Sequence, residues 1–280
     1  MKKAWKWIKL VLACIPRVAF EYFTYMRKMA KHPEKYPLEE RYAKVRSTVR
    51  FILRHMHINP LKDCYDVELE TRGKLYVGNH LSFLDPLFLI ALSPEPIGFV
   101  AKEEAMKIPF AGKMIKIING IFIDRKDPIS TLRAFRNLSK VIKEANMGYA
   151  VFPEGTRNHF PYGMMNEFHP GAFKLAQMAE LNIVPIALFG EQRILEEKPI
   201  YRNYPTQLTV LPEIPFEEVG KMGTSDFAVH IYHLIDVPLQ EMIRTDMAYM
   251  TDKAYKNKAP KWWKKKKEQP EEGENNEAAR

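Results

Sequence analysis

The chain has 280 residues, 46% of them hydrophobic, so it can fold around one sizeable core and is too apolar to be disordered throughout. Its formal net charge of +9 favours partners that carry phosphate, such as nucleic acid, an anionic membrane surface or a phosphorylated substrate. Its two cysteines, Cys14 and Cys64, are too few for a disulfide framework, and we interpret both as free thiols in a reducing compartment.

The first segment, residues 5–30, interleaves aromatic and aliphatic side chains with Lys and Arg, which is typical of a helix lying in the bilayer interface. Charges interrupt it too often for a spanning helix, and no cleavage site of small residues follows, so we expect neither a membrane span nor a cleaved signal. A helix packed on the protein's own core is the alternative. A second amphipathic helix, over residues 38–57, would complete an N-terminal membrane-interfacial helical pair.

From Leu75 onward, short apolar runs alternate with longer amphipathic segments. This alternation predicts an α/β fold with a mostly parallel central sheet covered by helices. We therefore expect a helical membrane-association segment over 1–58, the catalytic α/β domain over 59–250 and a basic, then acidic, flexible tail over 251–280. The predicted strands read LYVGN, IGFVA, GIFID, GYAVF, NIVPIAL and QLTVL.

The tail places Trp262 and Trp263 next to the lysine run 264–267 and then turns acidic. Such a run can anchor a protein to anionic lipid, although a solvated tail explains it equally well. No groove-reading or RNA-binding signature accompanies it, so we expect no nucleic-acid partner.

His80 and Asp85 follow the first of these strands and can meet across a turn. The carboxylate would then hold one imidazole nitrogen while the other acts as a general base. Ser82 lies beside them but lacks the glycine-flanked elbow that exposes a nucleophilic serine, so we disfavour a covalent intermediate.

Two later strands end in groups suited to phosphate. One runs into Arg125, and the other enters a turn, FPEGTR, centred on Gly155. A glycine lets backbone N–H groups approach an anion, Thr156 adds a hydroxyl, and Arg157 can hold a phosphate at two points. Each feature alone also fits a surface ion pair or an ordinary turn, and only their joint occurrence favours a phosphate site.

In this order, NHLSFLD, GIFIDR, FPEGTR and IVPIAL resemble the four sequence blocks of the 1-acylglycerol-3-phosphate acyltransferase family of glycerolipid synthesis. The resemblance implies that His80 is the general base and that Asp85 orients it. One departure is His169-Pro170, where relatives usually carry basic residues. The implied acceptor-phosphate site is Arg125, Glu154, Gly155, Thr156 and Arg157 with Lys102 added, and the implied acyl pocket is Val184, Pro185 and Ile186.

The implied reaction moves a fatty acyl group from acyl-CoA or acyl carrier protein to the sn-2 hydroxyl of lysophosphatidic acid, giving phosphatidic acid. No cofactor is expected beyond this acyl donor, and the scattered histidines predict no metal site. We expect the protein at the cytoplasmic face of the cell membrane, peripheral or monotopic, bound to an anionic surface. Another lysophospholipid acceptor, or a non-catalytic lipid-binding scaffold, is the alternative.

Overall fold

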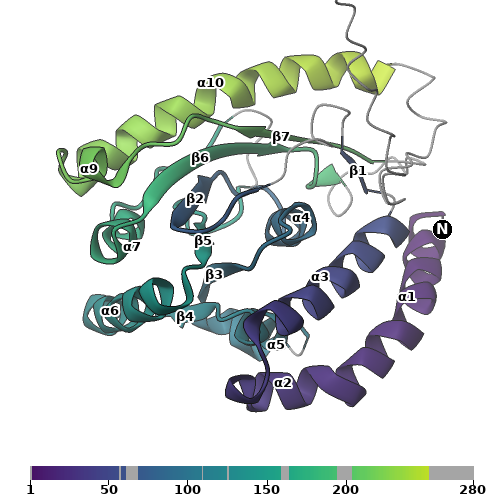
Figure 1. The fold of residues 1–280 in the computed structure, drawn as a ribbon. Coiled ribbons are helices and arrows are strands. Elements are labelled where there is room, and N and C mark those ends of the chain that lie inside the picture. The colour runs from purple at the N-terminus through teal and green to yellow at the C-terminus, as the bar shows by residue number, and fades with distance from the viewer. Residues whose placement is uncertain are drawn as a thin grey trace, which may run out of the picture.

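The computed structural model describes residues 2–56, 58–60, 69–108, 110–124, 126–158, 164–193 and 204–251. The chain begins with a helical segment made of α1 (Lys2–Glu21), the π-helical turn η1 (Tyr22–Met26) and α2 (Arg27–Lys31). After the 3₁₀ turn η2 (Pro33–Lys35), α3 (Leu38–His55) runs back beside α1 (Figure 1). The predicted pair of N-terminal helices is therefore confirmed.

The described strands form one seven-stranded sheet in the order β1-β7-β6-β2-β5-β3-β4. Strands β2 through β6 run parallel to one another, β7 pairs antiparallel with β6, and β1 pairs parallel with β7. This confirms the predicted α/β class with a mostly parallel sheet. The strands are β1 (Ile58–Pro60), β2 (Lys74–Gly78), β3 (Ile97–Lys102), β4 (Ile121–Ile123), β5 (Gly148–Val151), β6 (Asn182–Phe189) and β7 (Tyr204–Val210).

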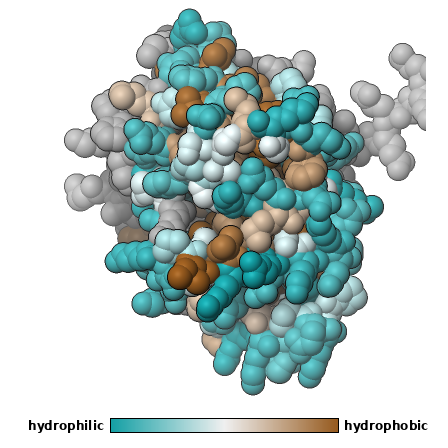
Figure 2. All heavy atoms as spheres, turned by 90° about the vertical axis from the view of Figure 1, so that its left-hand side faces the viewer, coloured by the Kyte–Doolittle hydropathy of each residue, from teal (hydrophilic) through white to brown (hydrophobic). Residues whose placement is uncertain are grey.

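Helices cover both faces of the sheet, and side chains alternate between the two cores, as a strand requires. On β6, Ile186 faces the core under α3 and α4, whereas its neighbour Ala187 faces the core under α7 and α10 (Figure 1). The side that carries α6 and α7 is largely hydrophilic, with a small hydrophobic group (Figure 2). The helices that follow β2 in the chain are α4 (Asp85–Leu92), the 3₁₀ helix η4 (Glu103–Lys107), α5 (Ala111–Ile117), α6 (Pro128–Ala145), α7 (Gly171–Ala179), α9 (Phe216–Val219) and α10 (Thr224–Thr251).

Helix α3 is part of the main core. Its Tyr42, Val45 and Val49 are buried in the same cluster as α4 and the sheet. The Tyr42 hydroxyl also bonds the carbonyls of Ile90 at 3.3 Å and Ser93 at 3.2 Å, at the end of α4. The second N-terminal helix therefore stabilises the α/β fold directly, and the three-part division of the chain stays a prediction.

Helix α1 differs, because its apolar side chains include an exposed stripe. Ile8, Leu12 and Ile15 are exposed at spacings of four and three residues, and Phe20 and Phe23 continue the exposed surface. Within the described residues, no helix has both the length and the apolar character needed to cross a membrane. Cys14 on this helix is a free thiol. Cys64 and the basic tail lie outside the described residues.

Candidate active site

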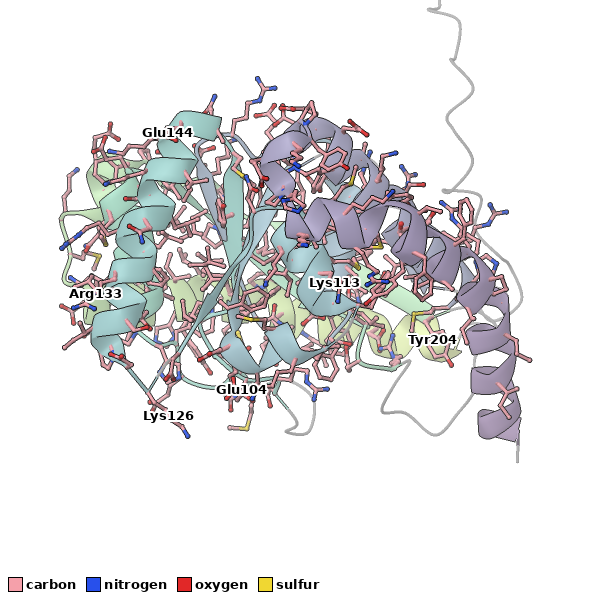
Figure 3. The ribbon with its side chains drawn as sticks, turned by 90° about the horizontal axis from the view of Figure 1, so that it is seen from below. Glu104, Lys113, Lys126, Arg133, Glu144 and Tyr204 are labelled. Carbon is pink, nitrogen blue, oxygen red and sulfur yellow. The ribbon has the colours of Figure 1, made fainter. Side chains whose placement is uncertain are left out.

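The sequence motifs meet where the parallel strands end. His80 follows β2, Glu154 follows the neighbouring β5, and Glu191 follows β6 on the other side of β2. Figure 3 shows the same edge farther along the sheet, where Glu104 and Lys126 follow β3 and β4. Ligand sites of open α/β sheets lie at this carboxyl edge.

The centre of the site is a hydrogen-bonded pair. His80 Nδ1 lies 2.9 Å from Oδ2 of Asp85, and the same oxygen accepts the backbone N–H groups of Leu81 at 2.8 Å and Ser82 at 2.9 Å. Asp85 is fully buried at the first turn of α4, where the helix dipole favours its negative charge. With Nδ1–H donated to the carboxylate, Nε2 of the imidazole is the nitrogen left to accept a proton.

Contacts from the segment that follows β5 fix His80 from the other side. Its ring stacks on Phe152 with centroids 4.5 Å apart and an interplanar angle of 20°. Its N–H donates to Glu154 Oε1 at 2.7 Å, and its carbonyl accepts the N–H of Asn158 at 2.8 Å. The backbone and ring of His80 are therefore both held in place before a substrate arrives.

Glu154 is a buried hydrogen-bond acceptor that connects two segments of the site. Its second oxygen, Oε2, accepts the N–H of Asn166 at 2.8 Å, so the carboxylate joins the loop after β2 to the segment before α7. Burial raises the pKa of Glu154, while the N–H groups of His80 and Asn166 lower it. These bonds fit an organising role, and a direct contact between Glu154 and phosphate stays a prediction.

The loop after β5 carries the other predicted phosphate ligands. Gly155 has a φ of +71°, a conformation that favours glycine, and its N–H bonds the carbonyl of Phe152 at 3.0 Å. Thr156 is exposed. The guanidinium of Arg157 lies 3.5 Å from the ring centroid of Phe83, in the loop between His80 and Asp85. The structure thus brings Arg157 onto the loop of the candidate base.

Two other predicted ligands stand apart from this cluster. Lys102 is exposed at the end of β3, two strands away from β2. Arg125 lies outside the described residues. A phosphate contact from either side chain stays a prediction.

The predicted acyl-pocket residues lie inside β6. Val184 and Ile186 are buried in the core under α4, and the carbonyl of Pro185 accepts the N–H of Leu211 at 2.9 Å. They pair with β2, the strand that leads to His80, and so help to fix the position of that strand. None of the three lines the apolar cavity that reaches Phe152, the ring on which His80 stacks, and their contact with an acyl chain stays a prediction.

That cavity has a volume of about 490 Å³ and lies at the carboxyl ends of β3, β4 and β5. Phe152, on which His80 stacks, forms part of its wall. His169 and Pro170, the departure from the family pattern, form another part. The lining is mostly apolar and comprises Val100, Ile123, Pro128, Thr131, Leu132, Phe135, Val151, Phe152, Pro153, His169, Pro170, Gly171, Ala172 and Lys174.

Ser82 has a structural position. Its hydroxyl is buried, donates to the carbonyl of Glu191 at 3.4 Å and accepts the N–H of Leu84 at 3.2 Å. A hydroxyl engaged in this way supports the turn between His80 and Asp85. The arrangement agrees with our interpretation that Ser82 is not a nucleophile.

Two residues of the site were not predicted from the sequence. Asn79 bonds both backbone groups of Leu188, at 2.9 and 2.8 Å, and so clamps the end of β2 to β6. In the sequence, the position of Asn79 directly before His80 could have indicated a role in the site. Glu191 is fully buried, and burial first, then the charge of Asp85, raise its pKa well above the ordinary value. No motif marks this glutamate.

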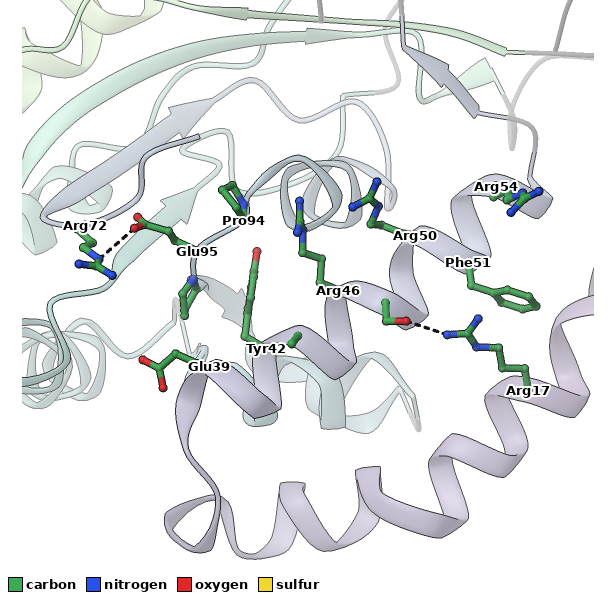
Figure 4. Close-up of a pocket in the computed structure, with 13 residues that line it drawn as sticks. Arg17, Glu39, Tyr42, Arg46, Arg50, Phe51, Arg54, Arg72, Pro94 and Glu95 are labelled. Atoms are coloured by element: carbon green, nitrogen blue, oxygen red, sulfur yellow. Dashed lines mark hydrogen bonds and ion pairs between the residues drawn. The ribbon is translucent and has the colours of Figure 1, made fainter. Parts of the chain in front are cut away.

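A second cavity, of about 550 Å³, lies along the outer face of α3 near the far end of α4 (Figure 4). Arg46, Arg50 and Arg54 line it at intervals of one helical turn, and Arg17 and Arg72 lie toward its two ends. Burial and the neighbouring Arg46 lower the pKa of Arg50. This concentration of positive charge suits an anion.

The comparisons with known proteins agree with one another. The family model described as Acyltransferase matches residues 35–189. A human 1-acyl-sn-glycerol-3-phosphate acyltransferase alpha is 33% identical over 205 residues, covering 70% of this chain and 71% of the relative. The enzyme of that name from Limnanthes alba is 29% identical over 188 residues, 63% of this chain, and this chain spans only 66% of its length.

Among solved structures, the 1-acyl-sn-glycerophosphate acyltransferase PlsC from Thermotoga maritima matches with a TM-score of 0.59. The match covers 85% of this chain and 97% of that one at 18% sequence identity. At this identity the likeness concerns the fold alone.

Proposed function

The chain belongs to the 1-acyl-sn-glycerol-3-phosphate acyltransferase family, and we propose that it transfers a fatty acyl group from an acyl thioester to the sn-2 hydroxyl of lysophosphatidic acid. The product is phosphatidic acid. The observation that carries this proposal is the contact between His80 and Asp85, in which three donors fix one oxygen of the carboxylate. No resident cofactor takes part in the proposed reaction.

In the proposed step, Nε2 of neutral His80 accepts the proton of the acceptor hydroxyl as its oxygen attacks the thioester carbonyl carbon. The tetrahedral intermediate then collapses. The carbon–sulfur bond breaks, and the imidazolium returns the proton to the departing thiolate. Asp85 stabilises the imidazolium while it exists, because its buried charge lies 2.9 Å from Nδ1.

The acceptor phosphate is proposed to lie over the loop 155–157. The N–H groups that follow Gly155 in this turn and the Arg157 guanidinium can bind an anion, and Phe83 fixes that guanidinium near His80. Binding the phosphate there would direct the free hydroxyl of the glycerol toward the imidazole.

We assign the donor's acyl chain to the apolar cavity of about 490 Å³. Phe152 contacts His80 on one side and lines this cavity on the other, so a chain inside it would end beside the base. Apolar burial of a chain provides binding energy of about 0.8 kcal/mol for each methylene group.

The partner surface is proposed to be an anionic membrane, met at its cytoplasmic face. Two observations support a membrane as the partner: α1 exposes Ile8, Leu12 and Ile15 in one stripe, and the arginine-lined cavity runs along α3 and reaches Arg17 of α1. Apolar side chains and cations displayed together suit the lipid interface.

The test is acceptor-dependent thiol release from oleoyl-CoA and from oleoyl-acyl carrier protein, with lysophosphatidic acid in mixed micelles. We expect release by the native chain and none above background by His80→Ala. Lysophosphatidylcholine serves as the competing acceptor, and a preference for it would show that lysophosphatidic acid is not the main acceptor. Failure of the native chain with both donors and both acceptors would favour a lipid-binding scaffold.

A further inference from the structure

Three buried carboxyl oxygens in the site have no hydrogen-bond partner among the described residues. They are Oδ1 of Asp85 and both side-chain oxygens of Glu191. Both residues have an exposed fraction of 0%. A buried carboxylate without a donor is costly, so this cluster needs a physical explanation.

The two carboxyl groups come from adjacent strand ends. Glu191 follows β6, Asp85 follows the loop after β2, and β2 pairs directly with β6. Ser82, whose N–H donates to Asp85, also donates its hydroxyl to the carbonyl of Glu191. The groups are close enough for the charge on Asp85 to raise the pKa of Glu191, in addition to the larger effect of burial.

Two neighbouring buried carboxyl groups do not both ionise readily, and one of them keeps a proton. The surroundings decide which one. Oδ2 of Asp85 accepts three N–H groups and so is suited to carry the charge, whereas in the described structure neither oxygen of Glu191 accepts a donor from another residue, and only its own backbone N–H acts on it. The proton therefore belongs on Glu191.

We propose that Glu191 is a positioning residue that stays protonated and donates a hydrogen bond to Oδ1 of Asp85. This inference rests on the proposed acyl transfer and goes beyond the four sequence blocks, since Glu191 lies just after the last of them. With donors on both oxygens, the carboxylate plane of Asp85 is fixed, and so is the imidazole that it holds. The pair of carboxyl groups carries one negative charge.

The other charged group facing Glu191 is Arg193, which lowers the pKa of Glu191 to a smaller extent than burial and Asp85 raise it. Arg193 is already engaged, because it pairs with Asp246 of α10 and donates to the carbonyl of Pro205 at 3.0 Å. The charge of Arg193 is therefore balanced by Asp246, which weakens its effect on Glu191.

The test compares Glu191→Gln, which keeps a donor of the same length, with Glu191→Met, which keeps the size and removes the donor. We expect Gln to retain kcat within about 3-fold and Met to lose about 10- to 100-fold in kcat, with KM for both substrates little changed. At alkaline pH the native kcat should fall as Glu191 ionises, and the Gln variant should keep its activity.

Thermal unfolding of each variant controls for folding, since a merely buried glutamate would tolerate Met at least as well as Gln. Equal losses in Gln and Met, or an unchanged Met variant, would overturn the proposal. A readout independent of turnover is the infrared carbonyl band of a protonated carboxylic acid, which Glu191→Gln should remove. If the native chain shows this band but transfers no acyl group, the proposed function fails and the proton assignment stands.

Discussion

At the scale of single residues, the site concentrates its hydrogen bonds on one carboxylate. Oδ2 of Asp85 accepts from the imidazole of His80 and from two backbone N–H groups, which keeps the ring oriented. Glu154 repeats this pattern one strand away, where it accepts the N–H of His80 itself. Orientation of the base therefore depends on two acids that need not touch the substrate.

The substitution Asp85→Asn tests the charge of this carboxylate separately from its shape. The amide oxygen can still accept the three donors, so the fold should persist while the imidazolium loses its counter-charge. We expect kcat to fall about 10²- to 10⁴-fold with little change in KM. Asp127→Asn is the matched control, because Asp127 caps α6 and Asn caps a helix equally well. A similar loss in both variants would refute the role.

Glu191 also predicts how stability depends on pH. Its pKa is raised in the folded chain, so the folded state binds its proton more tightly than the unfolded state does. That contribution is present at low pH and is lost as pH rises through the raised pKa. In urea unfolding, Glu191→Gln should gain stability relative to the native chain between pH 5 and pH 9. A difference independent of pH would show that Glu191 is ionised throughout.

The sequence was informative about residues whose partners are local. His80 and Asp85 are five positions apart, and a single turn brings them together, so their contact could be predicted. Glu191 and Asn79 act across strand pairs between segments far apart in the chain. A buried glutamate also looks like a surface residue in a sequence, because only the packing around it removes water.

At the scale of helices and strands, the prediction succeeded where hydrophobic patterning was strong. The predicted run NIVPIAL is β6, and the predicted run GYAVF contains β5. The short strand β1 and the π-helical turn at Tyr22–Met26 were not predicted. The first has three residues and is defined by its pairing with β7, and the second continues a helix without any change in composition.

Helices α6 and α7 enclose the apolar cavity, which gives a prediction about chain length. Ala172 is half-buried in its wall, and Ala172→Trp should fill part of the volume. We expect the ratio of kcat/KM for palmitoyl-CoA to that for octanoyl-CoA to fall at least about 10-fold, since one or two methylenes already matter in a shaped pocket.

The matched control is Ala145→Trp, at the exposed end of α6 away from the cavity. It should leave the chain-length ratio unchanged. If Ala172→Trp also leaves the ratio unchanged while the protein stays folded, the acyl chain binds elsewhere, and the predicted residues Val184, Pro185 and Ile186 regain priority.

At the scale of the whole molecule, both α1 and α10 expose apolar side chains to the surface. Changing Ile8, Leu12 and Ile15 of α1 together to Glu should abolish binding to vesicles of phosphatidylglycerol and phosphatidylcholine in a sedimentation assay. Changing Val229 and Val237, which are exposed on α10, to Glu should have little effect. Deleting residues 1–30 is a poorer test, because Met26 and Met29 are buried in the core.

If the α1 variant still binds vesicles as the native chain does, α1 is not the membrane contact. Circular dichroism should show that each variant retains its helices, since the substituted side chains are exposed. Vesicle binding and circular dichroism together distinguish loss of the membrane contact from loss of the fold.

The strand order also sets a sequence of events during synthesis. The central strand β2 emerges from the ribosome early, yet its two partners are β5 and β6, and β6 is made only at residues 182–189. The loop that carries His80 therefore lacks its hydrogen bonds to β6 until Leu188 reaches Asn79. By then α1 has long been exposed to the cell, so the nascent chain can reach a lipid surface before it can carry out catalysis.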